Sequence, residues 1–248
     1  MSDLMAAITA GGRVDGSFAE QIGTDVKALA PFGHRRLIDA ALDAARACGA
    51  RRIGVVGSPE VHAYCSGRID DPIPESPSGE ENIQRALAYA AGAPLLLLTS
   101  DLPFITADAV NHFLRRCDDV DAAMPLAAER DYELMFPGAP QHVVVLGGER
   151  LANGSVFYFA PGVAARVAQI AVRLFSARKS LVRMATLLGP GLLVKFAIRR
   201  LSIRDIEDRA HEIFGLAVRA VRDASPSMCY DIDVQTDYCY AVERLARG

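Results

Sequence analysis

The segment that most constrains the fold is residues 93–106, which contains four consecutive leucines at 95–98. This run follows a proline and is too short and too punctuated for a typical helix, but it suits a central parallel strand covered by helices on both faces. The strand ends on Ser100 and Asp101, and open α/β sheets bind ligands beyond the carboxyl ends of their strands. Asp101 is therefore the first candidate functional residue. The alternative is that Asp101 only caps a turn or the helix that follows.

Strands and helices alternate along the first hundred residues, which is typical of right-handed βαβ units around a parallel sheet. The pattern predicts strands at 4–9, 52–57 and 95–98 and helices at 37–48, 60–66 and 80–91, with an irregular, proline-rich and acid-rich segment at 70–79. Later in the chain we expect helices at 106–117, at 204–214 and from 236, and strands at 122–125, 142–146, 155–160, 217–221 and 227–234. We predict one three-layer α/β/α domain over residues 1–248, with a mostly parallel, Rossmann-like sheet.

Residues 161–215 are expected to be largely helical and to form an insertion or lid on this domain. The formal charge of the chain is -3, which argues against a general nucleic-acid binder, but residues 150–204 contain ten Lys or Arg and no Asp or Glu. Three interpretations are open. The cations meet a phosphorylated substrate, they contact an anionic membrane, or they form a solvated face that pairs with acids elsewhere.

The cysteine pattern and the length of the apolar runs bear on where the protein works. The five cysteines include no CxxC pair and no zinc-type spacing, so they are expected to be buried thiols in a reducing compartment. The N-terminus lacks a signal-type pattern, and no stretch approaches 18 uninterrupted apolar residues. We therefore expect a soluble, cytoplasmic protein.

A glycine turn follows the first predicted strand. Gly11 and Gly12 let the backbone approach a ligand closely and offer bare N–H groups to a phosphate or a base edge. The loop is neither a GxGxxG fingerprint nor a GK[ST] P-loop, so neither a dinucleotide-binding fold nor a Walker ATPase is supported. Lys27, further along, can neutralise phosphates at this loop, although a solvated surface lysine is the commoner fate.

Two further features are a pair of closely spaced aspartates and an Asn-Gly dipeptide. Asp231 and Asp233 are two residues apart, so on the predicted strand 227–234 they share one face, and with Asp101 they are plausible Mg²⁺ partners. The same spacing suits any half-exposed edge strand. Asn153 and Gly154 are expected to form a tight turn between two strands. The five histidines are scattered, which favours structural or surface roles over catalysis.

Taken in order and spacing, these motifs resemble the molybdenum-cofactor guanylyltransferase-like NTP transferases, which are nucleotidyltransferases of the glycosyltransferase-A type. The resemblance covers roughly residues 3–160 and 216–246. Its motifs are Ala10-Gly11-Gly12, Lys27-Ala28-Leu29 before Gly33 and Leu37-Ile38, Thr99-Ser100-Asp101-Leu102-Pro103-Phe104, and Asp231-Ile232-Asp233 with Thr236-Asp237. The resemblance implies a Mg²⁺-dependent enzyme that transfers a nucleotidyl group from an NTP to a small phosphorylated or hydroxyl-bearing acceptor and releases pyrophosphate.

The resemblance also assigns roles to residues. It implies that the nucleotide is bound by Ala10, Gly11, Gly12, Gly79, Asn82 and Ser100, that Arg13, Lys27 and Asp101 are catalytic, that Asp101 and Asp233 hold Mg²⁺, and that Asn153 and Gly154 lie on the acceptor side. The chain departs from the family at the loop, because Arg-Met-Gly and then Lys usually follow the two glycines closely. Here Arg13-Val14-Asp15-Gly16 follows and Lys27 stands several residues later.

Three alternative functions are open. The first is a glycosyltransferase of the same fold that uses a nucleotide-sugar donor, although such enzymes often carry Asp-x-Asp at the metal, whereas Leu102 and Pro103 follow Asp101 here. The second is a non-catalytic protein that binds nucleotide on the same fold, which the displaced loop lysine favours. The third is a peripheral membrane protein that handles a lipid-linked phosphate, which the basic segment favours.

Overall fold

The four leucines form β6 (Leu95–Thr99) at the centre of the sheet in the computed structural model, which describes residues 3–140, 143–177 and 189–247, with the side chains of 171–177 also left out. β6 pairs in parallel with β1 (Met5–Thr9) and antiparallel with β10 (Val156–Phe159). All four leucines are buried, which explains why the run lacks the alternation of a half-exposed strand. The predicted central strand is confirmed.

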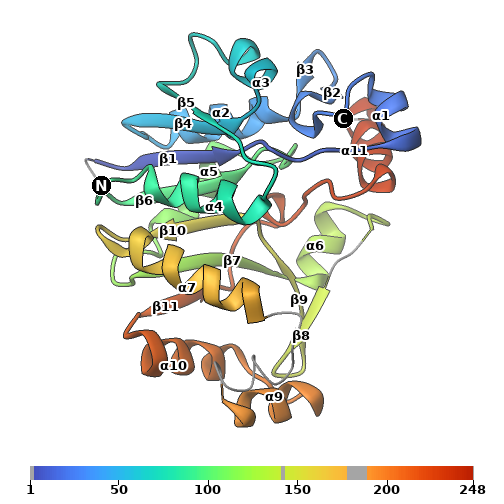
Figure 1. Cartoon of the computed structure of the whole chain (residues 1–248). Coiled ribbons are helices and arrows are strands. Elements are labelled where there is room, and N and C mark those ends of the chain that lie inside the picture. Colours follow the sequence, from blue (N-terminus) through green and yellow to red (C-terminus); the bar gives the residue numbers. More distant parts are fainter. Residues whose placement is uncertain (1–2, 141–142, 178–188, 248) are drawn as a thin grey trace.

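Within the described residues, nine strands form one mixed sheet whose first half is parallel (Figure 1). The order is β5 (Asp71–Pro74), β4 (Arg52–Gly57), β1, β6, β10, β7 (Ala122–Ala128), β9 (Glu149–Asn153) and β8 (Val143–Leu146), with β11 (Val218–Val221) parallel to β7. A separate ribbon joins β2 (Pro31–Phe32) and β3 (Arg35–Arg36). The parallel strands bring several carboxyl ends to one edge of the sheet, where ligands of such folds bind.

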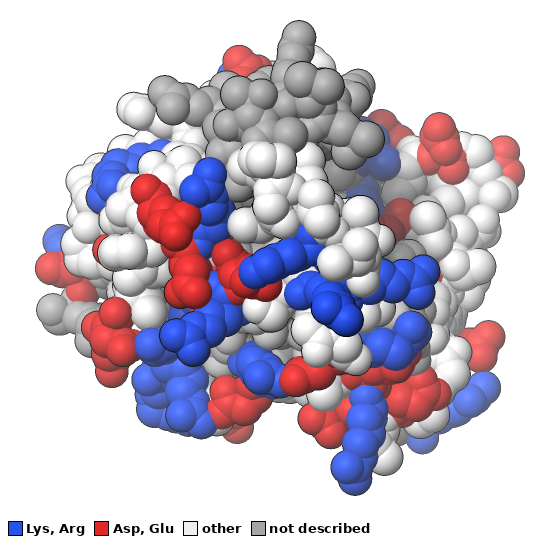
Figure 2. Space-filling view, turned by 90° about the horizontal axis from the view of Figure 1, so that it is seen from below, with Lys and Arg blue, Asp and Glu red and all other residues white. Residues whose placement is uncertain are grey.

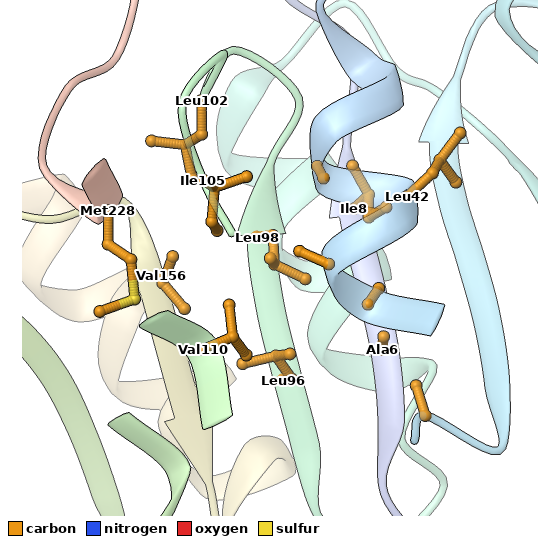
Figure 3. Packing of buried hydrophobic residues seen from close by; sticks show 14 of the residues in the cluster. Ala6, Ile8, Leu42, Leu96, Leu98, Leu102, Ile105, Val110, Val156 and Met228 are labelled. Carbon is orange, nitrogen blue, oxygen red and sulfur yellow. The ribbon is translucent and has the colours of Figure 1, made fainter. Parts of the chain in front are cut away.

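Helices cover both faces of the parallel half, which gives the predicted three layers (Figure 1). One face carries α2 (Ile38–Ala47) and α5 (Ala107–Leu114), and the other carries α4 (Gly79–Ala88) and α7 (Val163–Ala177). Side chains of β1 and β6 alternate between the two faces. Ile8, Leu96 and Leu98 pack toward α2 and α5 (Figure 3), whereas Leu95 and Leu97 pack toward α4 and α7.

Hydroxyl side chains cap the first turn of several helices. The other helical elements of the described residues are α1 (Gly16–Ile22), η1 (Lys27–Leu29), α3 (Pro59–Tyr64), α6 (Glu129–Met135), α9 (Pro190–Ala197), α10 (Ile203–Phe214), η2 (Pro226–Met228) and α11 (Gln235–Arg247). Ser78 Oγ accepts the N–H of Glu81 at 3.3 Å at the start of α4, and Thr106 Oγ1 accepts the N–H of Ala109 at 3.2 Å at the start of α5. Such caps satisfy N–H groups that lack a partner within the helix.

The expectation that 70–79 is irregular throughout was wrong, because β5 occupies Asp71–Pro74. Pro72 and Pro74 lack an N–H, which made the segment look unsuited to a sheet. β5 lies at the edge of the sheet and, among the strands that the structure describes, pairs with β4 alone, so an N–H on its outer side is not needed.

The predicted strand at 227–234 was also wrong. The chain there forms η2 and then an extended loop that enters α11, and the N–H of Ile232 donates to the carbonyl of Asp101 at 3.1 Å. Tyr230 and Ile232 are buried while the residues between and after them are less so, which produced the alternation of a strand without sheet pairing. Asp231 and Asp233 therefore do not share the face of a strand.

Asn153 and Gly154 do not form a hairpin turn. β9 and β10 both pair with β7 rather than with each other, β9 at residues 126–128 and β10 at 122–123. Between these pairings, residues 153–158 run beside residues 123–126, so the ladder contains two extra residues. The segment is therefore a bulge in one antiparallel run, a feature that bends a strand and redirects its side chains.

The basic region after β10 extends the molecule beyond the parallel half of the sheet. α7 packs beside α4, and α10 lies next to β11, with α9 at the end of the molecule opposite α1 (Figure 1). Among the ten cations of 150–204, Arg178, Lys179 and Arg183 lie outside the described residues. Within the described part of the chain, no helix is both long and apolar enough to cross a bilayer.

Candidate active site

The glycine loop continues β1 at the carboxyl end of the sheet. The N–H of Ala10 donates to the carbonyl of Val56 at 2.7 Å, which holds the start of the loop against β4. A Cβ at Gly11 would lie 2.7 Å from Asn82 Nδ2 and 2.9 Å from Glu75 Oε2, and one at Gly12 would lie 3.0 Å from Lys27 Cε. A side chain at either position would therefore push these groups away from the loop, and at Gly11 it would displace the hydrogen-bonded amide of Asn82.

The long connection after the glycines closes on itself. Arg13 and Val26 form an antiparallel bridge, and the N–H of Lys27 donates to the carbonyl of Gly12 at 3.1 Å. Between them, α1 anchors the excursion because Phe18 and Ile22 are buried in the cluster that contains Tyr238. Lys27 is thereby returned to Gly12 although many residues separate the two in the sequence.

Lys27 and Asp101 form an ion pair across the carboxyl ends of β1 and β6. The Lys27 Nζ lies 2.5 Å from Asp101 Oδ2 and also donates to the carbonyl of Ile232 at 2.8 Å. Both side chains are nearly buried, with exposed fractions of 14% and 11%. Asp101 Oδ1 is buried and has no hydrogen-bond partner, and such orphaned acceptors are rare enough to require an explanation. Ser100, which precedes Asp101, is buried, and its N–H donates to the carbonyl of Thr9.

Arg13 is engaged by acids at the opposite side of the loop. Its guanidinium pairs with Glu75 and lies 3.5 Å from Asp25. The other oxygen of Glu75, Oε2, is buried without a partner. Glu75 was missed in the sequence analysis, and its only signal there was its place in the acid-rich segment before the helix.

Asn82 closes the loop that leads into α4. Its Oδ1 accepts the N–H of Ser76 at 2.6 Å and its Nδ2 donates to the carbonyl of Ser76 at 2.9 Å. Asn82 is buried, and its Nδ2 lies beside Gly11, 2.7 Å from the position that a Cβ would occupy there. Gly79 begins the same helix, and a Cβ there would meet nothing within 4 Å, so close packing does not require glycine at this position.

Asp231 and Asp233 lie on the loop between η2 and α11. Ser155 Oγ donates to Asp231 Oδ2 at 2.7 Å, and burial, reinforced by the negative charges of Asp101 and Asp233, raises the pKa of Asp231 to about 6. Asp233 is exposed, and its N–H donates to the carboxylate of Asp237 at 2.9 Å. The loop therefore brings a second and a third carboxyl group to the side of the site where Asp101 lies.

Two pockets flank this loop. One has a volume of about 220 Å³, and Tyr132, Asn153, Asp231 and Asp233 are among its lining residues. The other, of about 370 Å³, lies between the start of the excursion and the loop, so that Arg13 and Asp233 both line it. Asp233 thus belongs to both pockets. Asn153 faces the first of them, while the N–H of Gly154 donates to the carbonyl of Pro125 at 2.9 Å in the bulge.

The donor set at Asp101 fits a hard divalent cation bound together with substrate. Mg²⁺ typically takes one or two carboxylates and completes its shell with phosphate oxygens and water. The buried and unpartnered Oδ1 of Asp101 is a carboxylate oxygen of this kind. Among the described residues, no group of three or more His, Cys, Asp and Glu side chains is arranged to hold a metal without substrate.

The fold is a nucleotidyltransferase fold of the glycosyltransferase-A type. In it, a glycine loop lies at the carboxyl edge of a half-parallel sheet, and an acidic residue follows the central strand at the same edge. The chain belongs to the family described as the MobA-like NTP transferase domain, whose model matches residues 6–184. No curated protein matches the chain.

Solved structures share the fold over nearly the whole chain. A hypothetical transferase from Thermus thermophilus is 26% identical, with a TM-score of 0.82 over 96% of this chain and 99% of that one. CMP:2-keto-3-deoxy-manno-octonic acid synthetase complexed with CTP is 14% identical, with a TM-score of 0.60 over 99% of each chain. Rv0371C of Mycobacterium tuberculosis H37Rv, in complex with manganese, is 15% identical, with a TM-score of 0.55 over 97% of this chain and 98% of that one.

Proposed function

We propose that this member of the NTP transferase family transfers the NMP group of an NTP to a small acceptor that carries a phosphate or a hydroxyl group, with release of pyrophosphate and with dependence on Mg²⁺. The observation that carries the proposal is the Lys27–Asp101 pair beside Gly12, with one carboxylate oxygen of Asp101 buried and unpartnered. The family match supports the nucleotidyl-transfer chemistry.

Lys27 is the residue we assign to the triphosphate. Its ammonium has three N–H donors, and Asp101 and the carbonyl of Ile232 accept two of them. The third is available to a phosphate oxygen near Gly12. Held from two sides, Lys27 can bind phosphate without first being ordered, which lowers the entropic cost of binding.

The nucleotide and metal roles follow the same geometry. In this proposal Ala10, Gly11, Gly12 and Ser100 form the floor under the nucleotide, Gly79 and Asn82 lie toward its base, Arg13 and Lys27 meet phosphates, and Asp101 and Asp233 hold Mg²⁺. When bound, the metal would neutralise charge on the phosphates. The manganese found with Rv0371C is compatible with a divalent ion at this fold, although it is a different metal.

We assign the acceptor to the pocket of about 220 Å³ that Asn153 and Asp231 line, beside the bulge at Gly154. A phosphate acceptor arrives ionised and needs no strong general base, so the residues of this pocket have mainly to position it. The five free cysteines support the further proposal of a reducing, cytoplasmic location for the single domain of residues 1–248.

The test is a screen of the four NTPs, with and without Mg²⁺, for ligand-induced thermal stabilisation and then for pyrophosphate release with pooled sugar phosphates and alcohols. We expect Mg²⁺-dependent stabilisation by one NTP, and Asp101→Asn should lower turnover roughly 100-fold or more. Asp118→Asn, at an exposed aspartate, is the matched control and should leave turnover unchanged. Stabilisation by nucleotide sugars alone would indicate a glycosyltransferase, and NTP binding without turnover on any acceptor would indicate a non-catalytic protein.

A further inference from the structure

α9 is an apolar helix that packs none of its residues into the core. Val194, Phe196 and the adjoining Ile198 have exposed fractions of 58%, 66% and 56%, and no residue of α9 is buried. A helix that is apolar on most of its surface is ordinarily buried or placed against a membrane. Exposed apolar groups gathered in one short segment mark an interaction surface.

The C-terminal end of α9 carries an arginine, Arg199, at the position where helices favour glycine. The N–H of Arg199 donates to the carbonyl of Phe196 at 3.0 Å and the N–H of Arg200 donates to that of Lys195 at 2.7 Å, which is a Schellman motif. Arg199 has a φ of 57°, in the left-handed region. Glycine adopts this conformation without strain, whereas a residue with a Cβ does not. The helix end therefore keeps a cation at a conformational cost.

Arg199 and Arg200 also differ from their basic neighbours in pairing. Lys195 Nζ lies 2.5 Å from Asp205, and Arg204 lies 3.6 Å from Asp208. No side chain among the described residues pairs with the guanidinium of Arg199 or of Arg200. Figure 2 shows that acidic and basic side chains intermix on the face seen from below.

We propose that α9 docks on anionic membrane surfaces, with Phe196 at the boundary of the acyl chains and Arg199 and Arg200 on lipid phosphates. Val194 and Ile198 lie one turn apart on the opposite side of the helix, about 200° around its axis from Phe196. An exposed apolar group next to unpaired guanidinium groups has the combination of chemistries that such an interface offers. Asp205 and Asp208 of α10 also lie beside α9, where Lys195 and Arg204 pair with them. Docking itself is independent of the proposed nucleotidyl transfer.

The fold connects this surface to the acceptor pocket. The N–H of Gly147, in the turn between β8 and β9, donates at 2.7 Å to the carbonyl of Leu201, in the connection between α9 and α10. β9 then runs from that turn to Asn153, which lines the pocket of about 220 Å³. If the proposed transfer reaction holds, docking favours an acceptor that is presented at a membrane surface, such as a phosphate carried on a lipid.

The experiment is co-sedimentation of the purified full chain with phosphatidylcholine vesicles that contain or lack phosphatidylglycerol, at low and at high salt. We expect binding only to the anionic vesicles, weakened by salt because the charges lie at the surface. Phe196→Asp should weaken binding about tenfold or more. Arg199→Glu and Arg200→Glu should each weaken it by about 25-fold, since each positive charge lost costs about fivefold and reversal counts twice.

Matched variants on other elements complete the design. Leu134→Asp, on α6, changes an apolar residue with an exposed fraction of 70%, and Arg115→Glu, after α5, changes an exposed arginine. Both should bind like the wild type. Arg199→Gly should bind about fivefold more weakly while melting no lower than the wild type, because glycine relieves the left-handed strain. A generally damaged protein would melt lower.

Three results would overturn the proposal. They are the failure of the wild type to bind anionic vesicles, equal binding to neutral vesicles, and equal losses in the α9 variants and the two controls. Light scattering of the protein without vesicles tests whether α9 instead contacts a second copy of the chain. A dimer that Phe196→Asp dissociates, without vesicle binding, would assign α9 to contact with a second copy of the chain.

Discussion

Replacing Lys27 by methionine tests whether the ion pair at the site is an electrostatic requirement of the folded chain. Methionine keeps most of the side-chain volume but removes the only described partner of Asp101 Oδ2, and Oδ1 already has none. A buried charge left without its partner costs roughly 3–5 kcal/mol, and the small exposure of Asp101 favours a value of about 3 kcal/mol. For a chain of this length, the melting temperature should fall by about 6–12 °C.

Mg²⁺ should oppose this loss. In Lys27→Met both oxygens of Asp101 are free for a hard cation, whereas in the wild type the ammonium competes for Oδ2. Mg²⁺ should therefore raise the melting temperature of Lys27→Met more than that of the wild type, because a ligand that binds only the folded state stabilises it. Differential scanning fluorimetry with and without Mg²⁺ measures both effects.

The double variant Lys27→Met with Asp101→Asn is the control, because it removes the uncompensated charge along with its partner. It should regain about 2 kcal/mol relative to Lys27→Met alone and should lose the response to Mg²⁺. A melting temperature of Lys27→Met within about 2 °C of the wild type, or a double variant as unstable as the single one, would refute the electrostatic account.

Three further predictions concern other parts of the fold. Gly154→Ala should destabilise the protein by about 1–3 kcal/mol in urea unfolding, because a Cβ would lie 2.8 Å from the carbonyl of Met228, whereas Gly191→Ala, in open space, should not. Burial alone would raise the pKa of Asp39, but hydrogen bonds from the Arg36 N–H, Tyr64 and Arg68 outweigh it and lower the pKa. Its contribution to stability is therefore complete above its unfolded pKa, near 3.8, and is lost as the pH falls through the lower folded value, so urea unfolding of Asp39→Asn should depend less on pH in this range. Asn82→Ala should weaken NTP binding in calorimetry, since it removes both hydrogen bonds that hold Ser76 above the glycine loop.

The parts of the fold that could be predicted are those where local pattern and tertiary role agree. β6 has leucine at four consecutive positions because helices cover both faces of the strand. Asp101 could be recognised because it is a charged residue just after such a buried strand. Most of the predicted helices carry a Ser or Thr cap and start close to where the pattern placed them.

The errors arose where an extended chain and a paired strand look alike. Residues 229–234 alternate because they cross the end of the sheet with Tyr230 and Ile232 turned inward, and periodicity cannot tell this from sheet pairing. At the site, the pairing of Glu75 with Arg13 depends on β5, which the prolines concealed. Contacts between distant segments, such as that between Lys27 and Asp101, follow from topology and not from local pattern.

The closed excursion between Arg13 and Val26 has a consequence for engineering and for divergence. Its two ends lie side by side, joined by the Arg13–Val26 bridge and the Lys27–Gly12 hydrogen bond. The length of the segment between them can therefore change without moving Lys27 relative to Gly12. The spacing between Gly12 and Lys27 is then set by the closing contacts and not by the number of residues between them. The same segment can also make contacts with other parts of the fold, as α1 does with α11 through the rings of Phe18 and Tyr238.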